Sequence, residues 1–501
     1  MRKLQMAEFA ISNFYVDKVD EDKLVEEAII KMLAQLDPHS TYSDAEEVKK
    51  MNEPLQGNFE GIGVQFQMIE DTLLVVQPVS NGPSEKIGIL AGDRIIAVND
   101  SAIAGVKMST EEIMKRLRGP KGSKVNLKIV RRGVQDPLVF TVKRDKIPIL
   151  SLDASYMIQP KTGYIRINRF GATTAEEFKK AMKELQKQGM KDMILDLQGN
   201  GGGYLNAAID LANEFLSQKE LIVYTEGRTA KRSDFYAKGN GEFRNGRLIV
   251  LVDEYTASAS EIVSGAVQDW DRGIIVGRRS FGKGLVQRPI DLPDGSMIRL
   301  TIARYYTPAG RCIQKPYDSS TDYNKDLIER FNHGELMNAD SIHFPDSLKV
   351  QTKKLGRTVY GGGGIMPDYF VPIDTTLYTD YHRNLVAKGA VIKFTMKFIE
   401  GHRKELANKY KKFESFNEKF IIDDDMLATL REMGEKEGVK FNEEQYQKSL
   451  PLIKTQLKAL IARDLWDMNE YFRVMNTTNE SVQKALEILN SEEYQKKLRA
   501  N

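Results

Sequence analysis

The spacing of hydrophobic residues divides the 501-residue chain into four regions. Residues 1 to 55 are predicted to be helical. Within them, EDKLVEEAIIKMLAQL places apolar residues at positions 24, 25, 28, 29, 30, 32, 33 and 36, a broad stripe of helical period. LDPHSTYSD follows, and its proline and turn-forming residues predict the end of that helix.

Residues 56 to 147 show a β pattern. Short apolar runs such as GIGVQFQMI, TLLVVQPV and KVNLKIVRRG are separated by glycine and Asx turns, which predicts five or six strands. STEEIMKRLRG is predicted to form a short helix that carries Glu111 and Glu112 in its first turn. The region is therefore expected to be a separate β domain.

Residues 148 to 375 alternate between strand and helix patterns. GYIRINRF, MILDLQ, RLIVLVD and GIIVGR have the character of strands, and TAEEFKKAMKELQKQ, NAAIDLANEFL and SEIVSGAVQDW that of helices. This order predicts an α/β domain with a largely parallel sheet covered on both faces. Residues 376 to 501 are predicted to be charged, packed helices that serve as a cap or a subunit contact.

Composition excludes several classes of protein. Hydrophobic residues make up 41% and charged residues 29%, which is typical of soluble globular chains. With 73 basic and 70 acidic residues the net charge is +3, so no strong basic field indicates nucleic-acid binding. No apolar run approaches the roughly 18 to 20 residues that span a bilayer.

Metal and disulfide chemistry have little support in the sequence. Cys312 is the single cysteine, which excludes an internal disulfide and a cysteine-based zinc cluster. The five histidines include no His-x-x-x-His pair, so no metal site is predicted. The first twenty residues lack the apolar core of a signal peptide, which leaves a cytoplasmic protein or one whose leader has been removed.

Two serines, Ser258 and Ser260, follow the strand RLIVLVD at the start of a predicted helix. Backbone N–H groups at a helix N-terminus are unpaired and favour negative charge. Ser258 at that place can attack a carbonyl while the N–H of Ala259 faces the oxyanion. The alternative is that either serine only caps the helix.

A glycine-rich turn in MILDLQGNGGGYL is the second candidate feature. Gly201 to Gly203 permit a tight turn and close approach to a ligand. Tyr204 stands where a dinucleotide fingerprint needs glycine, and the Gly-Lys-Ser/Thr of a phosphate-binding loop is missing. Donation of N–H groups to an oxyanion fits the turn better.

Lys283 in RRSFGKGLVQRP is the candidate base. In a strand it would share one side with Leu285 and Gln287. A lysine base must be neutral near pH 7, which requires a drop of about 3 pKa units and hence burial in an apolar pocket. The alternative is a surface lysine with a strand-edge glutamine, and His333 stays open as a distant base.

Together these segments resemble the C-terminal processing (tail-specific) serine peptidases. LDPHSTY, EGIGV, GPSEKIGILAGDRIIAVND, LDLQGNGGGYL, TASASEIVSGAVQD and FGKGLVQ occur in that family's order between residues 36 and 287. TPAGRCIQKP and GGGGIMPDYFVP extend the match to about residue 374. The resemblance implies a crotonase/ClpP-like α/β peptidase core, a PDZ β domain at 56 to 147 and helical N- and C-terminal segments.

The resemblance also assigns roles. It makes Ser258 the nucleophile, Lys283 the general base and Gln287 its orienting partner, and this excludes the distant histidine. The oxyanion donors fall on Ala259 and on Gly202 or Gly203. The glycine turn departs from the family pattern, which usually has arginine where this chain has Gln198 and often proline where it has Gly201.

In the PDZ module, the loop from Gly61 through Ile62 and Gly63 to Val64 would hold a free carboxylate, and an extended peptide would add a strand alongside. Arg118 is either a helper in that capture or a solvated surface arginine.

The sequence therefore predicts a serine endopeptidase that captures protein chain ends and cleaves near them through a Ser–Lys dyad, without metal or cofactor. The alternatives are a catalytically silent PDZ scaffold and a crotonase-like acyl-CoA enzyme; the latter accounts neither for the PDZ module nor for Lys283. The resemblance further implies a bacterial cell-envelope setting, with the leader absent from this sequence, and a homodimer. It names no substrate, adaptor or regulator.

Overall fold

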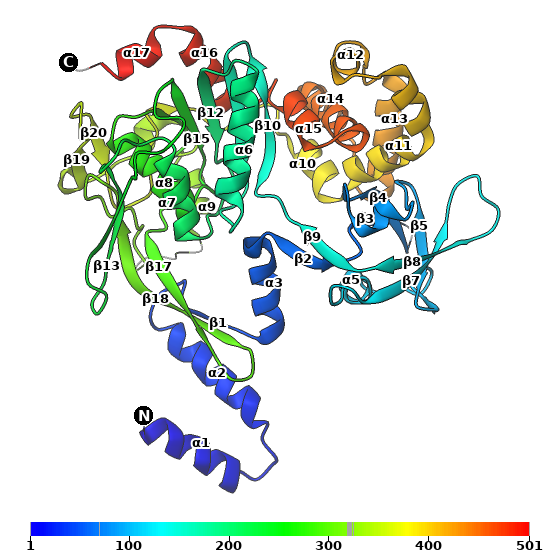
Figure 1. Cartoon of the computed structure of the whole chain (residues 1–501), viewed down its shortest axis with the longest axis horizontal. Coiled ribbons are helices and arrows are strands. Elements are labelled where there is room, and N and C mark those ends of the chain that lie inside the picture. The colour runs from blue at the N-terminus through cyan, green and yellow to red at the C-terminus, as the bar shows by residue number, and fades with distance from the viewer. Residues whose placement is uncertain (1, 70, 318–322, 324, 500–501) are drawn as a thin grey trace.

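The computed structural model describes residues 2–69, 71–317, 323 and 325–499, and Figure 1 shows the arrangement of its elements. A six-stranded sheet in the order β10-β11-β12-β15-β16-β21 forms the centre of the α/β core. Its strands are β10 (Leu152–Gln159), β11 (Thr162–Ile167), β12 (Asp192–Asp196), β15 (Leu248–Val252), β16 (Ile274–Gly277) and β21 (Tyr369–Phe370). The pairs from β11 to β21 are parallel, as the alternating pattern predicted. β10 was not predicted and is antiparallel to β11.

Helices cover both faces of this sheet. Every residue of β12, β15 and β16 is buried, which explains their continuous apolar runs. One face packs against α6 (Thr174–Lys187), α7 (Leu205–Asn213) and α8 (Ala259–Asp269). The other packs against α16 (Glu480–Asn490) and α17 (Glu493–Lys497), so the end of the chain supplies one layer of the core.

A second sheet lies beside the core in the order β1-β18-β13-β14, and β17 also pairs with β18. Its strands are β1 (Thr41–Ser43), β13 (Leu221–Glu226), β14 (Ser233–Tyr236), β17 (Leu285–Asp291) and β18 (Met297–Tyr306). The helix α2 (Glu21–Leu33) ends before the segment LDPHSTYSD, as predicted, but residues 41–43 of that segment form a strand that pairs with β18, which the sequence did not predict. Smaller elements nearby are α9 (Asp326–Asn332), η1 (Ala339–Ser341), η2 (Asp346–Leu348), β19 (Lys349–Gln351) and β20 (Thr358–Tyr360).

The β domain is built on the sheet β3-β4-β5-β7-β8, with β6 paired to β5. Its elements are β3 (Val64–Ile69), β4 (Thr72–Pro78), α4 (Pro83–Lys86), β5 (Arg94–Val98), β6 (Ser101–Ala102), α5 (Thr110–Leu117), β7 (Lys124–Val130) and β8 (Leu138–Lys143). Alternate residues of β7 are buried, as expected for a sheet with one wet face. β2 (Asn58–Gly61) pairs with β9 (Asp145–Pro148) where the chain enters and leaves the domain.

The two ends of the chain are helical. The N-terminal segment contains α1 (Arg2–Phe14), α2 (Glu21–Leu33) and α3 (Ala45–Gln56), and in Figure 1 α1 and α2 project away from the rest of the chain. The C-terminal bundle contains α10 (Asp380–Ala387), α11 (Ala390–Lys409), α12 (Phe413–Lys419), α13 (Asp424–Lys436), α14 (Glu443–Leu465) and α15 (Met468–Met475). Trp466 packs against Phe413 and Phe416 in this bundle. The bundle also contacts the β domain through an ion pair of 3.2 Å between Arg94 and Glu400.

Candidate active site

Ser258 occupies a strained position between β15 and α8. Its backbone φ is +57°, a left-handed region that non-glycine residues rarely adopt and that is often found at functional sites. The side chain is half-buried. Ser260 is fully buried, and its hydroxyl donates to the Asn200 carbonyl at 3.0 Å. Of the two serines, Ser258 is the accessible one and Ser260 is structural.

A buried glutamate links the backbones of Ser258 and Lys283. The Glu261 carboxylate accepts from the N–H of Ser258 at 2.8 Å and from the N–H of Lys283 at 2.9 Å. It also accepts from the Ser280 hydroxyl at 2.5 Å and the Gly282 N–H at 2.8 Å. Glu261 therefore fixes the serine turn against the lysine loop, although 22 residues separate it from Lys283.

Tyr305 links the same two residues through their carbonyl groups. Its buried hydroxyl lies 3.0 Å from the Ser258 carbonyl oxygen and 2.5 Å from that of Lys283, so its single proton can be donated to either. Glu261 thus holds the N–H groups of Ser258 and Lys283 together, and Tyr305 holds their carbonyl groups. Residues 25 positions apart in sequence are brought to one site.

Lys283 lies in an extended loop that precedes β17, so the prediction that it belongs to a strand was wrong. Burial lowers the pKa of its amine below the ordinary value of 10.5, and the positive charge of Arg299 lowers it further. The carboxylates of Glu261 and Asp37 act in the opposite direction. The net shift is toward easier loss of the proton, the direction that a general base requires.

Gln287 reaches the surroundings of Lys283 through an intermediary. Its Nε2 donates to the Thr301 hydroxyl at 3.3 Å, and that hydroxyl donates to Asp37 at 3.0 Å. Among the contacts of the described residues, Gln287 makes no hydrogen bond to Lys283. Asp37 also accepts from the Ser40 hydroxyl at 2.6 Å, so the turn before β1 contributes to the site.

The glycine turn approaches the serine closely. A Cβ on Gly202 would lie 2.8 Å from the Ser258 Cβ and 3.0 Å from the Ala259 nitrogen, so only glycine fits there. The Gly202 N–H donates to the Asn200 side chain at 2.8 Å and is not available to an oxyanion in this arrangement. Within the described part of the chain, no hydrogen bond occupies the N–H of Gly203 or Ala259.

A pocket of about 220 Å³ lies next to the lysine loop. Its lining includes Phe281, His39, Tyr323 and Lys315. The His39 Nε2 and the Tyr323 hydroxyl are 2.7 Å apart. Burial and then the charge of Lys283 lower the pKa of His39 to about 4, so this histidine is neutral at physiological pH.

The four residues of the predicted carboxylate loop connect β2 to β3, the edge strand of the β-domain sheet. Gly61 ends β2, Ile62 is buried, Gly63 has a φ of +73°, and Val64 begins β3. β3 pairs only with β4 among the described strands, which leaves its other edge for a peptide strand.

The C-terminal end of α5 lies against this loop, because a Cβ on Gly61 would be 3.7 Å from the Arg118 Cα. The Arg118 side chain stacks on Phe59 and forms an ion pair with Glu53 of α3. A role of Arg118 in binding the substrate carboxylate remains a prediction.

Sequence reasoning missed three residues that assemble this site: Glu261, Tyr305 and Asn200. Glu261 was detectable, since Ser-x-x-Glu at a helix start is a capping-box pattern. Tyr305 carried no signal, because its role depends on how β18 packs against α8. Within the described residues, no group of three or more histidine, cysteine or acidic side chains is arranged to hold a metal ion.

Sequence comparison identifies the family. Residues 161–321 match the model "Peptidase family S41" and residues 61–146 match "PDZ domain". A carboxy-terminal-processing protease of Bartonella bacilliformis is 40% identical over 60% of this chain and 69% of that protein. A probable CtpA-like serine protease of Staphylococcus aureus (strain MSSA476) is 31% identical over 86% of this chain and 84% of that protein. The chain belongs to the carboxy-terminal processing peptidases of family S41.

This membership confirms the predicted fold class and makes the chain a serine-type peptidase with a PDZ domain; the comparisons give no support to the silent scaffold. The carboxy-terminal processing protease CtpB of Bacillus subtilis is 36% identical over 63% of this chain and 66% of that protein, slightly under two thirds of its length. Residues 1–47 match "Activating protease CtpB N-terminal domain", and residues 381–467 match a family of unknown function.

The chain is also similar to parts of solved structures. The photosystem II D1 C-terminal processing protease is 28% identical, with a TM-score of 0.37 over 75% of this chain and 94% of that one. The PDZ domain of a carboxy-terminal protease from Vibrio cholerae is 33% identical, with a TM-score of 0.17 over 18% of this chain and 99% of that one. Both TM-scores lie below 0.5, and the family assignment rests on the sequence matches.

Proposed function

We propose that this peptidase hydrolyses peptide bonds near the C-termini of proteins, with Ser258 as nucleophile and Lys283 as general base. The observation that carries the proposal is the double link of Ser258 and Lys283 through Glu261 and Tyr305. It fixes a strained, accessible serine beside a lysine whose pKa is lowered by burial.

In the first half-reaction, the neutral Lys283 amine takes the proton of the Ser258 hydroxyl while Oγ bonds to the scissile carbonyl carbon. The carbonyl oxygen becomes an oxyanion. When the C–N bond breaks, the Lys283 ammonium returns the proton to the departing amine. Water then attacks the acyl-enzyme, Lys283 accepts its proton, and Ser258 recovers a proton as the new carboxyl end leaves.

We assign the oxyanion donors to the N–H groups of Ala259 and Gly203, which have no hydrogen-bond acceptor among the described residues, and give Gly202 the role of close packing against Ser258. A donor of this kind typically contributes about 2.7–4 kcal/mol to the transition state. Gln287 remains the proposed orienting partner and acts through Thr301 and Asp37, whose charge reaches Lys283.

The PDZ domain would supply selectivity for chain ends. In the proposal, N–H groups of the loop from Gly61 to Val64 bind the terminal carboxylate, and the peptide pairs with the free edge of β3. The substrate chain then continues to the Ser258 site. Relatives named as carboxy-terminal processing proteases support cleavage near a captured chain end.

We further propose a homodimer in which a second copy covers α1. No residue of α1 is buried, and Phe9 and Phe14 are 62% and 77% exposed. Exposed aromatic side chains on a projecting helix favour a protein partner. The bacterial cell envelope is the proposed location, on the family resemblance; among the described residues, no helix has the length and apolarity to cross a membrane.

The decisive experiment combines labelling with proteolysis. A fluorophosphonate should label the wild-type chain at Ser258, and Ser258→Ala should abolish both labelling and cleavage of an unstructured protein followed by mass spectrometry. Ser260→Ala should retain labelling. Lys283→Ala and Lys283→Arg should fold and be inactive, the latter because a guanidinium does not deprotonate. Fragments from Ser258→Ala would refute the proposal, and an intact substrate with the wild type would favour the silent scaffold.

A further inference from the structure

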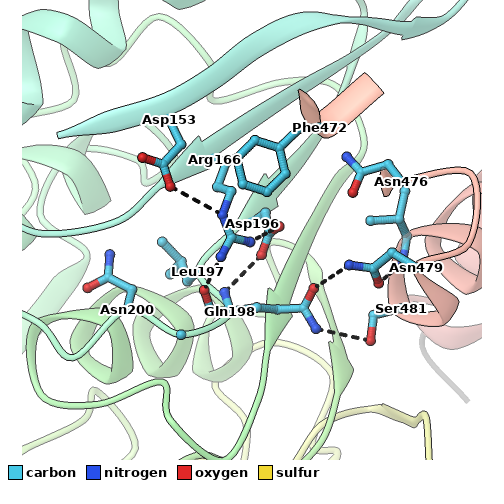
Figure 2. Close-up of polar contacts among 12 residues, drawn as sticks. Asp153, Arg166, Asp196, Leu197, Gln198, Asn200, Phe472, Asn476, Asn479 and Ser481 are labelled. Carbon is cyan, nitrogen blue, oxygen red and sulfur yellow. Dashed lines mark hydrogen bonds and ion pairs between the residues drawn. The ribbon is translucent and has the colours of Figure 1, made fainter. Parts of the chain in front are cut away.

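The loop that carries the oxyanion donor is tied to the C-terminal helix α16 through one side chain. Figure 2 shows Gln198, the second residue after β12, extending toward α16. Its Nε2 donates to the Ser481 hydroxyl at 3.3 Å, and its Oε1 accepts from the Asn479 Nδ2 at 3.2 Å. Both hydrogen-bonding ends of the Gln198 amide are thus used by α16 (Figure 2).

The main chain of Gln198 is fixed from the other side by two charged residues. Its N–H donates to the Asp196 carboxylate at 2.8 Å, and its carbonyl accepts from Arg166 of β11 at 2.8 Å. Arg166 also pairs with the fully buried Asp196, and its guanidinium lies 4.8 Å from the ring centroid of Phe472 on α15 (Figure 2). The C-terminal helices therefore contact both the side chain of Gln198 and the arginine that holds its carbonyl.

From Gln198 a short series of contacts leads to the reacting atoms. The next N–H, of Gly199, donates to Asp253 at 2.9 Å. The Asn200 side chain donates to the Ile167 carbonyl at 2.9 Å and accepts from the N–H of Gly202 at 2.8 Å. The Asn200 carbonyl accepts from the N–H of Ala257 at 2.9 Å, immediately before Ser258. The direction in which the Gly203 N–H points therefore depends on the contacts that fix this loop.

We propose that Gln198 is a positioning residue for catalysis, through which α16 sets the geometry of the oxyanion loop. The inference rests on the proposed function. In this proposal the C-terminal helices contribute to transition-state stabilisation, although they lie far from Ser258 in sequence. Rate is sensitive to such placement, since a shift of about 1 Å from a remote change can lower it about 10²-fold.

A matched pair of substitutions separates this role from helix docking in general. Gln159 of β10 is bonded to Asn490 at the opposite end of α16, with amide distances of 3.1 Å in both directions. Gln198→Leu and Gln159→Leu therefore each remove one glutamine link between α16 and the sheet. We expect Gln198→Leu to lower kcat about 10- to 100-fold with little change in KM, and Gln159→Leu to leave kcat near wild type.

Asn479 supplies a second test that preserves the helix cap, because its Oδ1 accepts from the N–H of Val482. Asn479→Ser keeps a capping oxygen but is too short to reach Gln198, and should lower kcat in the same way. Asn479→Asp also keeps the cap, and rotation of the Gln198 amide can restore both hydrogen bonds, with the Ser481 hydroxyl as the second donor. That variant should retain wild-type kcat.

Binding measurements give a readout that a purely structural role would not move. The Ser258 hydroxyl adds to the carbonyl carbon of a peptide aldehyde and forms a tetrahedral adduct. The affinity of the aldehyde should therefore fall with Gln198→Leu in proportion to kcat/KM. The affinity of an uncleaved carboxyl-terminal peptide for the PDZ domain should not change. Thermal unfolding checks that each variant is folded.

The inference is overturned if Gln198→Leu keeps wild-type kcat and aldehyde affinity, or if Gln159→Leu loses as much as Gln198→Leu. Failure of the proposed function looks different. In that case the wild-type chain itself would neither react with the fluorophosphonate nor cleave protein.

Discussion

Replacing Glu261 with glutamine tests how the buried carboxylate acts on the base. The carboxylate accepts four hydrogen bonds, two at each oxygen: Ser280 and Gly282 at Oε1, and Ser258 and Lys283 at Oε2. A glutamine placed with its oxygen toward Ser258 and Lys283 keeps the link between them. Its NH₂ group can donate to the Ser280 hydroxyl, which leaves the Gly282 N–H unpaired.

The cost in stability follows from these contacts. One unpaired buried donor costs about 1–3 kcal/mol, and the surviving bonds lose their charge assistance, partly offset by removal of a buried charge. We expect Glu261→Gln to lower the free energy of unfolding by about 2–4 kcal/mol. Glu261→Leu breaks the link itself and should lower kcat by at least about 100-fold, comparable to the loss of an oxyanion donor.

The pH dependence carries the sharper prediction. The negative charge of Glu261 raises the pKa of Lys283 against the effect of burial, so Glu261→Gln should lower that pKa further. The acid limb of kcat/KM, measured with a fluorogenic peptide, should therefore move to lower pH. A limb that stays in place or moves to higher pH would refute the view that this carboxylate acts electrostatically on the base.

Three other results are expected. Lys283→Met should be more stable than wild type near neutral pH in urea unfolding, because folding lowers the pKa of Lys283 and the unfolded wild-type chain therefore binds the proton more tightly. The stability of wild type should rise as the pH approaches 10.5, and a difference between the two proteins that does not change with pH would contradict this. Phe9→Glu with Phe14→Glu should convert a dimer to a monomer by light scattering without loss of fold, whereas an unchanged mass would place the interface elsewhere. Amidation of a peptide's C-terminus should weaken its binding to the PDZ domain at least about 10-fold by calorimetry, and equal affinity would exclude carboxylate capture.

Local pattern was sufficient to predict the elements and the family, but not the assembly of the site. The apolar runs of β12, β15 and β16 and the turns of the β domain are encoded locally. The order of motifs containing Ser258 and Lys283 identified the peptidase. The antiparallel edge strand β10 and the short strand β1 were missed, because their pairing partners supply the hydrogen bonds that define them.

The same limit applies to the support of the site. Neither Tyr305 nor Gln198 stands in a distinctive local motif. Tyr305 contacts Lys283, 22 positions away, and Gln198 contacts Asn479 and Ser481 of the α16 region, 281 and 283 positions away. Lys283 was placed in a strand because GLVQRP continues as one, yet close packing of Gly282 and Gly284 against neighbouring backbone keeps the lysine in the preceding loop. Such three-dimensional contacts leave no periodic signal.

Chemical replacement of the base tests the central claim most directly. In a Cys312→Ser background, Lys283→Cys should be inactive, and treatment with 2-bromoethylamine should restore cleavage by building a less basic amine at that position. The acid limb of kcat/KM for the restored enzyme should lie at lower pH than that of wild type. Cleavage by the untreated Lys283→Cys protein, or restored activity with an unmoved acid limb, would contradict proton transfer from Ser258 to Lys283.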